Sequence, residues 1–193
     1  MSKYSKIIVF FICLWPIYSI SYSIFDNSLG AEPVKKITHH FGEWTLIFIC
    51  LTLSMSPLKK ITNSNIWIKY RRMLGLFVFF YATIHMFTYI GLDYWFDWKP
   101  IINDVIKKKY IFVGFLAWLL LIPLAATSSQ KMIKLLKKNW KRVHRLIYII
   151  AIFGILHYIW LSKTIFFGPL IYLIIIIILL LFRIKFNKSS TKV

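Results

Sequence analysis

Two of the five histidines lie deep inside long apolar runs, where a titratable ring is costly unless it has a partner. His85 comes 12 residues after Met73, and His157 comes 12 residues after Arg145, near the points where their apolar runs begin. At about 1.5 Å per residue, each ring lies roughly 18 Å along its helix. With both helices running in the same direction, the two imidazoles are expected at one depth. Two imidazoles at one depth on separate helices are what axial ligation of a haem iron requires.

A small residue precedes each of these histidines by three positions, Ala82 before His85 and Gly154 before His157. Such residues are expected to leave room for a porphyrin one turn away. The alternative interpretation is that both histidines form hydrogen bonds between helices and that the small residues only allow close packing. An iron with both axial positions taken has no open position for oxygen or substrate, which favours outer-sphere electron transfer.

A third histidine lies in the basic string WKRVHRL, residues 140–146, where the fifth apolar run begins. Arginines in this string and before the third run suit haem propionates or a flavin phosphate; alternatively, they bind lipid head groups. This histidine, His144, precedes His157 by 13 residues, which is about 19 Å along a helix. A second redox cofactor is therefore expected in the inner half of the membrane. The residues expected to serve it are His144, which could ligate a second haem, and Arg71, Arg72, Arg142 and Arg145.

The remaining histidines and the two cysteines are not expected to do chemistry. His39 and His40 precede the second apolar run and are expected to be solvated loop residues. Cys13 and Cys50 lie in different apolar runs without metal or redox spacing, so they are expected to be small packing residues.

Composition decides what kind of protein must position these side chains. The 193 residues are 59% apolar and 16% charged, with a mean hydropathy of +0.69, which places the chain in a bilayer. If each spanning helix needs about 20 residues, six or seven helices fill the chain and exclude a soluble catalytic domain. The net charge of +19 comes from basic residues between apolar runs, which indicates lipid head groups as partners and no nucleic acid.

Six apolar runs bounded by charged residues predict an all-α integral membrane protein, a six-helix transmembrane bundle forming a single domain over residues 1–193. The expected spans are 7–24, 41–58, 73–92, 110–126, 145–162 and 165–182. Pro16, Pro57 and Pro123 are expected to kink or close their helices. No internal repeat is evident. With six spans, 18 of the 25 Lys and Arg residues share a side with both termini, so the positive-inside rule predicts cytoplasmic termini.

The outer segment 93–109 combines aromatic, aliphatic and acidic residues. Its apolar residues recur at near-helical spacing, so it is expected to lie at the membrane interface, with Pro100 interrupting any single helix. A second hypothesis is that Asp93, Asp97 and Asp104 dock an electron acceptor through a small, charge-sensitive contact.

Several strings in the chain together resemble a known family. They are RRMLGL (71–76), YATIH (81–85), PLAATS (123–128), WKRVHRLIY (140–148) and LHYIW (156–160). They resemble the haem-binding membrane subunits of the bacterial periplasmic methionine-sulfoxide reductase system, within the wider group of ferric-reductase-like transmembrane proteins. The likeness covers about residues 30–182.

This resemblance implies a cytochrome b of the bacterial inner membrane that uses haem b and FMN. It implies electrons taken from the quinol pool or from a cytosolic flavin reductase. It implies delivery of those electrons to a periplasmic molybdenum-containing catalytic subunit that reduces methionine sulfoxide in oxidised proteins. The chain itself is then an electron-transfer subunit without substrate chemistry of its own.

One position departs from the wider group, whose members carry two histidines on the third span. Arg72 stands 13 residues before His85, where a second histidine is usual. An inner haem would therefore lack its usual opposite ligand, which is compatible with a flavin there.

Two other classes of function remain possible from the residues alone. A small transporter or proton-relay protein would use intramembrane histidines with acidic partners, yet only Glu43 lies near a span. A structural subunit that anchors a partner would carry packed, inert histidines.

Overall fold

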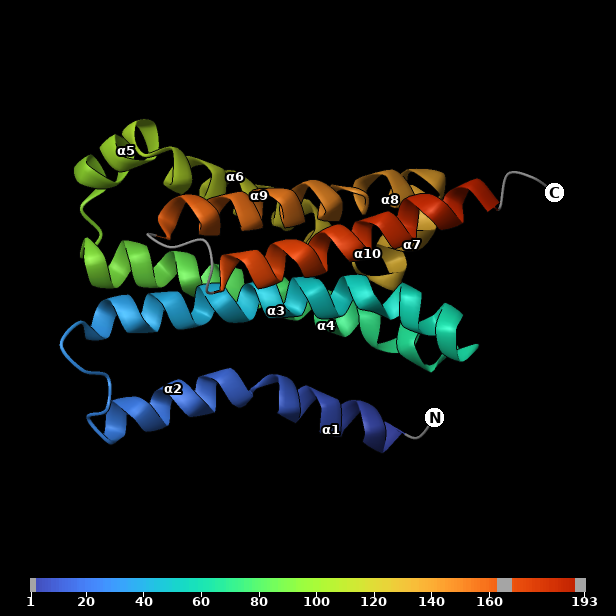
Figure 1. The fold of residues 1–193 in the computed structure, drawn as a ribbon, viewed down its shortest axis with the longest axis horizontal. Coiled ribbons are helices and arrows are strands. Elements are labelled where there is room, and N and C mark those ends of the chain that lie inside the picture. The colour runs from blue at the N-terminus through green and yellow to red at the C-terminus, as the bar shows by residue number, and fades with distance from the viewer. Residues whose placement is uncertain (1–2, 163–167, 190–193) are drawn as a thin grey trace.

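The computed structural model describes residues 3–162 and 168–189, in which all regular structure is helical (Figure 1). The elements are α1 (Lys3–Cys13), α2 (Trp15–Phe25), α3 (Pro33–Thr62), α4 (Ile66–Thr88), the π-helical turn η1 (Tyr89–Asp93), α5 (Trp98–Lys107), α6 (Lys109–Ala126), α7 (Gln130–Leu136), α8 (Lys138–Val143), α9 (Leu146–Leu161) and α10 (Pro169–Ser189).

The expectation of an all-α membrane bundle is confirmed. Five helical segments are long and apolar enough to cross a membrane: Tyr4–Phe25, Pro33–Thr62, Ile66–Asp93, Lys109–Ala126 and Lys138–Leu161. They overlap the first five expected spans. The apolar part of α10, Pro169–Arg183, is shorter, and residues 165–167 of the sixth expected span lie outside the described residues.

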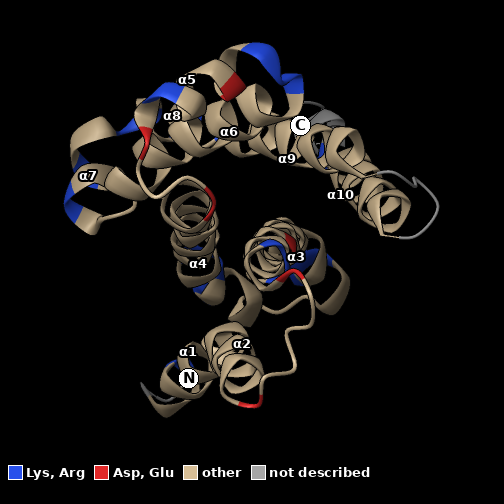
Figure 2. Ribbon diagram, turned by 90° about the vertical axis from the view of Figure 1, so that its left-hand side faces the viewer, with Lys and Arg blue, Asp and Glu red and all other residues tan. Residues whose placement is uncertain are grey.

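The long helices run side by side along the longest axis of the molecule, and α1 begins at the same end at which α10 finishes (Figure 1). We call this the inner end, where α7 and α8 also lie, and the opposite end, with η1 and α5, the outer end. The tightest helix pairs are α3 with α4 and α6 with α9, while α10 packs on both α3 and α9. Figure 2 looks onto the outer end, where acidic residues gather.

The first span consists of two helices, α1 and α2, because Pro16 lies in the first turn of α2 and has no N–H group to continue the backbone hydrogen bonds of α1. The break frees carbonyl groups in an apolar region, where each needs a donor. The hydroxyl of Tyr81, which is fully buried on α4, donates to the Cys13 carbonyl at 2.6 Å. The kink expected at Pro16 is therefore real, and it ties the first span to α4.

The expectation that His39 and His40 belong to a solvated loop is wrong. The helix α3 begins at Pro33, so both residues lie in its second turn. His39 is exposed, whereas the Nε2 atom of His40 lies 2.9 Å from the Pro16 carbonyl and bonds to it. This bond ties α3 to the first turn of α2. The two cysteines are free and at least half-buried, as expected for packing residues.

Replacing Tyr81 by Phe removes the donor to the Cys13 carbonyl but keeps the aromatic ring. The carbonyl is then left in an apolar interior, so we expect Tyr81→Phe to lower the free energy of unfolding by about 1–3 kcal/mol. Thermal unfolding in a mild detergent measures the loss. Tyr18→Phe, on the exposed surface of α2, is the control, and equal stability of the two variants would show that the bond contributes nothing.

Candidate functional site

The structure brings His85 of α4 and His157 of α9 together. Their ring centroids lie 6.0 Å apart and their planes make an angle of 81°. The two helices belong to different halves of the bundle, so the pair joins α3 and α4 to α6 and α9. The expected matching of depth is observed.

Each ring of the pair is held through its Nδ1 atom by a backbone carbonyl. His85 Nδ1 donates to the Thr38 carbonyl of α3 at 2.8 Å, and His157 Nδ1 donates to the Tyr110 carbonyl of α6 at 2.7 Å. A carbonyl oxygen can only accept, so Nδ1 carries the hydrogen in both rings. The lone pair of each neutral imidazole is then on Nε2, the nitrogen that a metal can bind.

The separation of the two rings suits one metal ion between them. A metal bonds an imidazole nitrogen at about 2 Å and the ring centre lies about 1 Å further, so opposed rings on one ion have centroids roughly 6 Å apart. The observed 6.0 Å agrees with that value. A haem needs only two protein ligands, because the porphyrin supplies the others, so this pair of imidazoles would suffice to hold one.

One of the two small residues that the sequence indicated, Gly154, does not face the histidine pair. A Cβ atom on Gly154 would lie 3.2 Å from Leu46 and 3.8 Å from Ile49, so this glycine faces the packed surface of α3. The expectation that it leaves room for a macrocycle is wrong. Gly42 and Gly114, which sequence reasoning missed, are the glycines in contact with the two imidazoles.

The third histidine lies at the inner end, where α8 gives way to α9. His144 packs against Trp140 with ring centroids 4.1 Å apart and ring planes tilted by 34°. The Thr127 hydroxyl donates to the Pro123 carbonyl, so His144 Nε2, at 3.3 Å, donates to the hydroxyl oxygen. His144 therefore forms its hydrogen bond through Nε2, whereas His85 and His157 form theirs through Nδ1.

The four arginines expected to serve the inner cofactor differ in burial. Arg72, Arg142 and Arg145 are exposed. Arg71 is partly buried and interacts electrostatically with His144 and with Arg183 of α10.

Sequence reasoning missed Arg183, which follows a long aliphatic run and resembles a simple helix-end cation. Its guanidinium donates to the Tyr148 hydroxyl at 2.7 Å and to the Ser56 hydroxyl at 2.9 Å. The inner half thus holds partly buried positive charge at Arg71 and Arg183, while the acidic residues of the sequence fall elsewhere, in segments near the outer end.

Comparison with known proteins identifies the family. Residues 38–155 match the family model described as "Ferric reductase like transmembrane component". A relative from Herminiimonas arsenicoxydans, named protein-methionine-sulfoxide reductase heme-binding subunit MsrQ, is 44% identical over 182 residues, covering 93% of this chain and 84% of its own. A protein of the same name from Xanthomonas oryzae pv. oryzae (strain MAFF 311018) is 45% identical over 169 residues, covering 86% and 78%. The chain belongs to the MsrQ family. No solved structure matches it.

In this MsrQ-family chain the outer segment folds as the amphipathic helix α5. Pro100 lies in its first turn, where the missing N–H has no helical partner, so the expected interruption at Pro100 is wrong. The Asp97 side chain caps the helix by accepting a hydrogen bond from the Lys99 amide at 3.1 Å.

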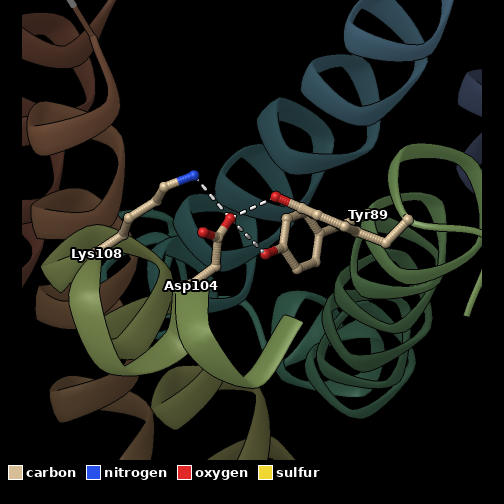
Figure 3. A network of polar contacts seen from close by, with 4 residues as sticks. Tyr89, Asp104 and Lys108 are labelled. Carbon is tan, nitrogen blue, oxygen red and sulfur yellow. Dashed lines mark hydrogen bonds and ion pairs between the residues drawn. The ribbon is translucent and has the colours of Figure 1, made fainter. Parts of the chain in front are cut away.

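Asp104 is a structural residue at the centre of a polar network (Figure 3). Its carboxylate accepts hydrogen bonds from the Lys108 ammonium at 2.7 Å, from the Tyr94 hydroxyl and from the Tyr89 hydroxyl at 3.3 Å. Only 8% of the residue is exposed, so the hypothesis that Asp104 docks a partner is wrong. The network fixes α5 to η1, directly beyond the helix that carries His85.

The charges of this network hold each other ionised. Burial alone would raise the pKa of the Asp104 carboxyl, but hydrogen bonds from Lys108 and Tyr94 outweigh burial and leave this pKa below its ordinary value. The bond to Asp104 raises the pKa of the Lys108 ammonium. Ionised Asp104 therefore stabilises the fold above the usual aspartate pKa, and its contribution is lost as the pH falls through the lowered pKa.

We expect Asp104→Asn to lower the free energy of unfolding by about 1 kcal/mol at neutral pH, because the charged acceptor of three donors is lost. The difference from the unaltered protein should stay constant down to about pH 4 and shrink below it, where wild-type Asp104 is protonated too. Unfolding in detergent between pH 3 and 8 measures it, with the exposed Asp26→Asn as the control. A difference that does not change with pH would exclude an ionic role.

Proposed function

We propose that the chain is a membrane cytochrome b that transfers electrons across the bacterial inner membrane to a periplasmic methionine-sulfoxide reductase, in support of the repair of oxidised proteins. The observation that carries this proposal is the pair of imidazoles with centroids 6.0 Å apart, each oriented by a carbonyl on Nδ1. Membership of a family whose curated members are named heme-binding subunits supports it.

In this proposal, His85 and His157 are the axial ligands of one haem b in the outer half of the membrane. The haem supplies one-electron redox chemistry when bound. The protein's part is to present two Nε2 lone pairs, to keep both rings from turning and to surround the iron with apolar helices. Since both axial positions are taken, the site moves electrons without binding oxygen or substrate.

We further propose a second redox group in the inner half, served by His144 and Arg71 with Arg72, Arg142 and Arg145 at the water-facing rim. The reason for this second group is the distance that electrons must travel. One haem in the outer half leaves much of the roughly 30 Å hydrocarbon layer without a redox group. FMN suits this region better than a second haem, since His144 Nε2 is bonded to Thr127 and the position of the usual opposite ligand is Arg72.

We also propose the chain's redox partners and its orientation in the membrane. The donor is the quinol pool or a cytosolic flavin reductase, and the acceptor is a periplasmic molybdenum-containing catalytic subunit. Both termini are cytoplasmic, which the basic charge of the segments at the inner end supports through the positive-inside rule.

A transporter or proton-relay function is less well supported. A relay needs groups that take up and release protons, whereas the Nδ1 partners of His85 and His157 are backbone carbonyls. Glu43 is exposed and accepts a hydrogen bond from Tyr172 at 3.2 Å, apart from the histidine pair. The geometry therefore favours ligation over proton transfer.

Replacing either His85 or His157 by Ala removes one of the two proposed ligands. We expect each variant to lose the low-spin bis-histidine spectrum, seen as a split Soret and alpha band on dithionite reduction, and most of its haem. His39→Ala, exposed on α3, should keep both. Unchanged haem content and reduced spectra in both variants would contradict the assignment. Reoxidation of the reduced protein by the purified catalytic subunit then tests the proposed acceptor.

The inner cofactor is tested by quantifying flavin and haem in one detergent-purified sample. We expect Arg71→Gln to reduce the content of the second cofactor several-fold while the outer haem is kept, because a partly buried cation facing an anionic group is lost. Lys59→Gln, which removes one exposed positive charge from the last turn of α3, is the control for net charge and should keep both cofactors. One haem and no other cofactor in the unaltered protein would contradict the proposal.

A further inference from the structure

The two histidines are held by the same arrangement, repeated in the two halves of the bundle. The carbonyl that orients His85 belongs to the residue 47 positions earlier, Thr38, and the carbonyl that orients His157 lies 47 positions earlier, at Tyr110. Each histidine also contacts a glycine 43 positions earlier, Gly42 or Gly114. The sequence shows no repeat, but the helix pairs α3 with α4 and α6 with α9 share this register.

The geometry of an α-helix explains why carbonyl and glycine come together. A helical carbonyl points along the axis towards the residue four positions later. A side chain that donates to this carbonyl from outside must therefore lie over that later residue, where a Cβ atom would stand. Gly42 is four residues after Thr38, and Gly114 is four residues after Tyr110.

The distances show how little room there is. A Cβ atom built on Gly114 would lie 2.6 Å from His157 Nδ1 and 2.9 Å from Cε1. One built on Gly42 would lie 3.0 Å from His85 Cε1 and 3.1 Å from Nδ1. The separations at Gly114 are too short for any side chain, so the His157 ring would have to move. Those at Gly42 demand a smaller shift of the His85 ring.

We propose that Gly42 and Gly114 are positioning residues for the two axial ligands. Each lets its helix approach the imidazole closely enough for the Nδ1–H···O=C bond that fixes the ring. This inference rests on the proposed function, since it concerns how the two histidines meet a haem iron.

The bond to Nδ1 has a consequence for the iron. A hydrogen bond on the far nitrogen makes an imidazole a stronger donor through Nε2, and stronger donation favours the oxidised state of the metal. A side chain that displaces the ring weakens this bond. The reduction potential should then rise, or the ligand should be lost altogether.

The test is a set of three glycine variants of the full chain, purified in detergent with haem bound. We expect Gly114→Ala to show a raised midpoint potential or loss of the low-spin spectrum, and Gly42→Ala to show a smaller change of the same kind. Gly75→Ala is the matched control, because its Cβ atom would make only an ordinary contact with Thr52 at 3.8 Å. It should keep the wild-type potential and spectrum.

The possible results separate the inference from the proposed function. Absence of haem from the unaltered protein overturns both. A haem-loaded Gly114→Ala protein with wild-type spectrum and potential, or a Gly75→Ala protein changed as much as Gly114→Ala, overturns the inference alone. Loss of haem from Gly114→Ala with helical content retained supports it.

A measurement on the unaltered protein covers the case in which a variant does not fold. Low-spin reduced haem is diamagnetic, so nitrogen NMR of labelled histidine can observe the ring N–H groups directly. Two Nδ1–H protons protected from exchange with water support the arrangement. Ring protons that exchange freely overturn it.

Discussion

An imidazole inside hydrocarbon must satisfy its N–H group. The rings of His85 and His157 both meet this requirement by donating from Nδ1 to a neighbouring helix. That choice determines the tautomer, leaves Nε2 as the metal-binding atom and requires a second helix against each histidine-bearing helix. The same bonds link α3 to α4 and α6 to α9, the two most closely packed helix pairs.

The distribution of charge separates the two ends of the molecule in a chemically useful way. At the outer end, Asp104 is engaged within the fold and Asp97 caps a helix. At the inner end, Arg71 and Arg183 are partly buried, and Arg183 donates hydrogen bonds to the hydroxyls of Tyr148 and Ser56. This distribution supports the proposal of an anionic cofactor in the inner half and of a haem between the two histidines further out.

The sequence predicted well what depends on local pattern and poorly what depends on distant partners. Hydropathy located the first five spans, and equal spacing from the starts of their apolar runs placed His85 and His157 at one depth. The role of His40 was wrong because its partner, the Pro16 carbonyl, lies on α2. For Asp104, Lys108 is a local partner four residues later, but the donors Tyr89 and Tyr94 come from the segment before α5 and carry no local signal. Gly42 and Gly114 were missed for the same reason. Their signal is a shared spacing of 43 residues to a histidine, which has meaning only once the helix pairs are known.

The break at Pro16 bears on how the protein is made. The carbonyl of Cys13 receives its hydrogen bond from Tyr81, 68 residues later in the chain. A ribosome adding about 5–20 residues per second delivers that tyrosine several seconds after the first span has been made. During that interval the open carbonyl needs water, a lipid head group or the insertion machinery as its partner. The first span therefore reaches its final polar pairing only after α4 has entered the membrane, which makes helix docking, and not insertion, the step that completes it.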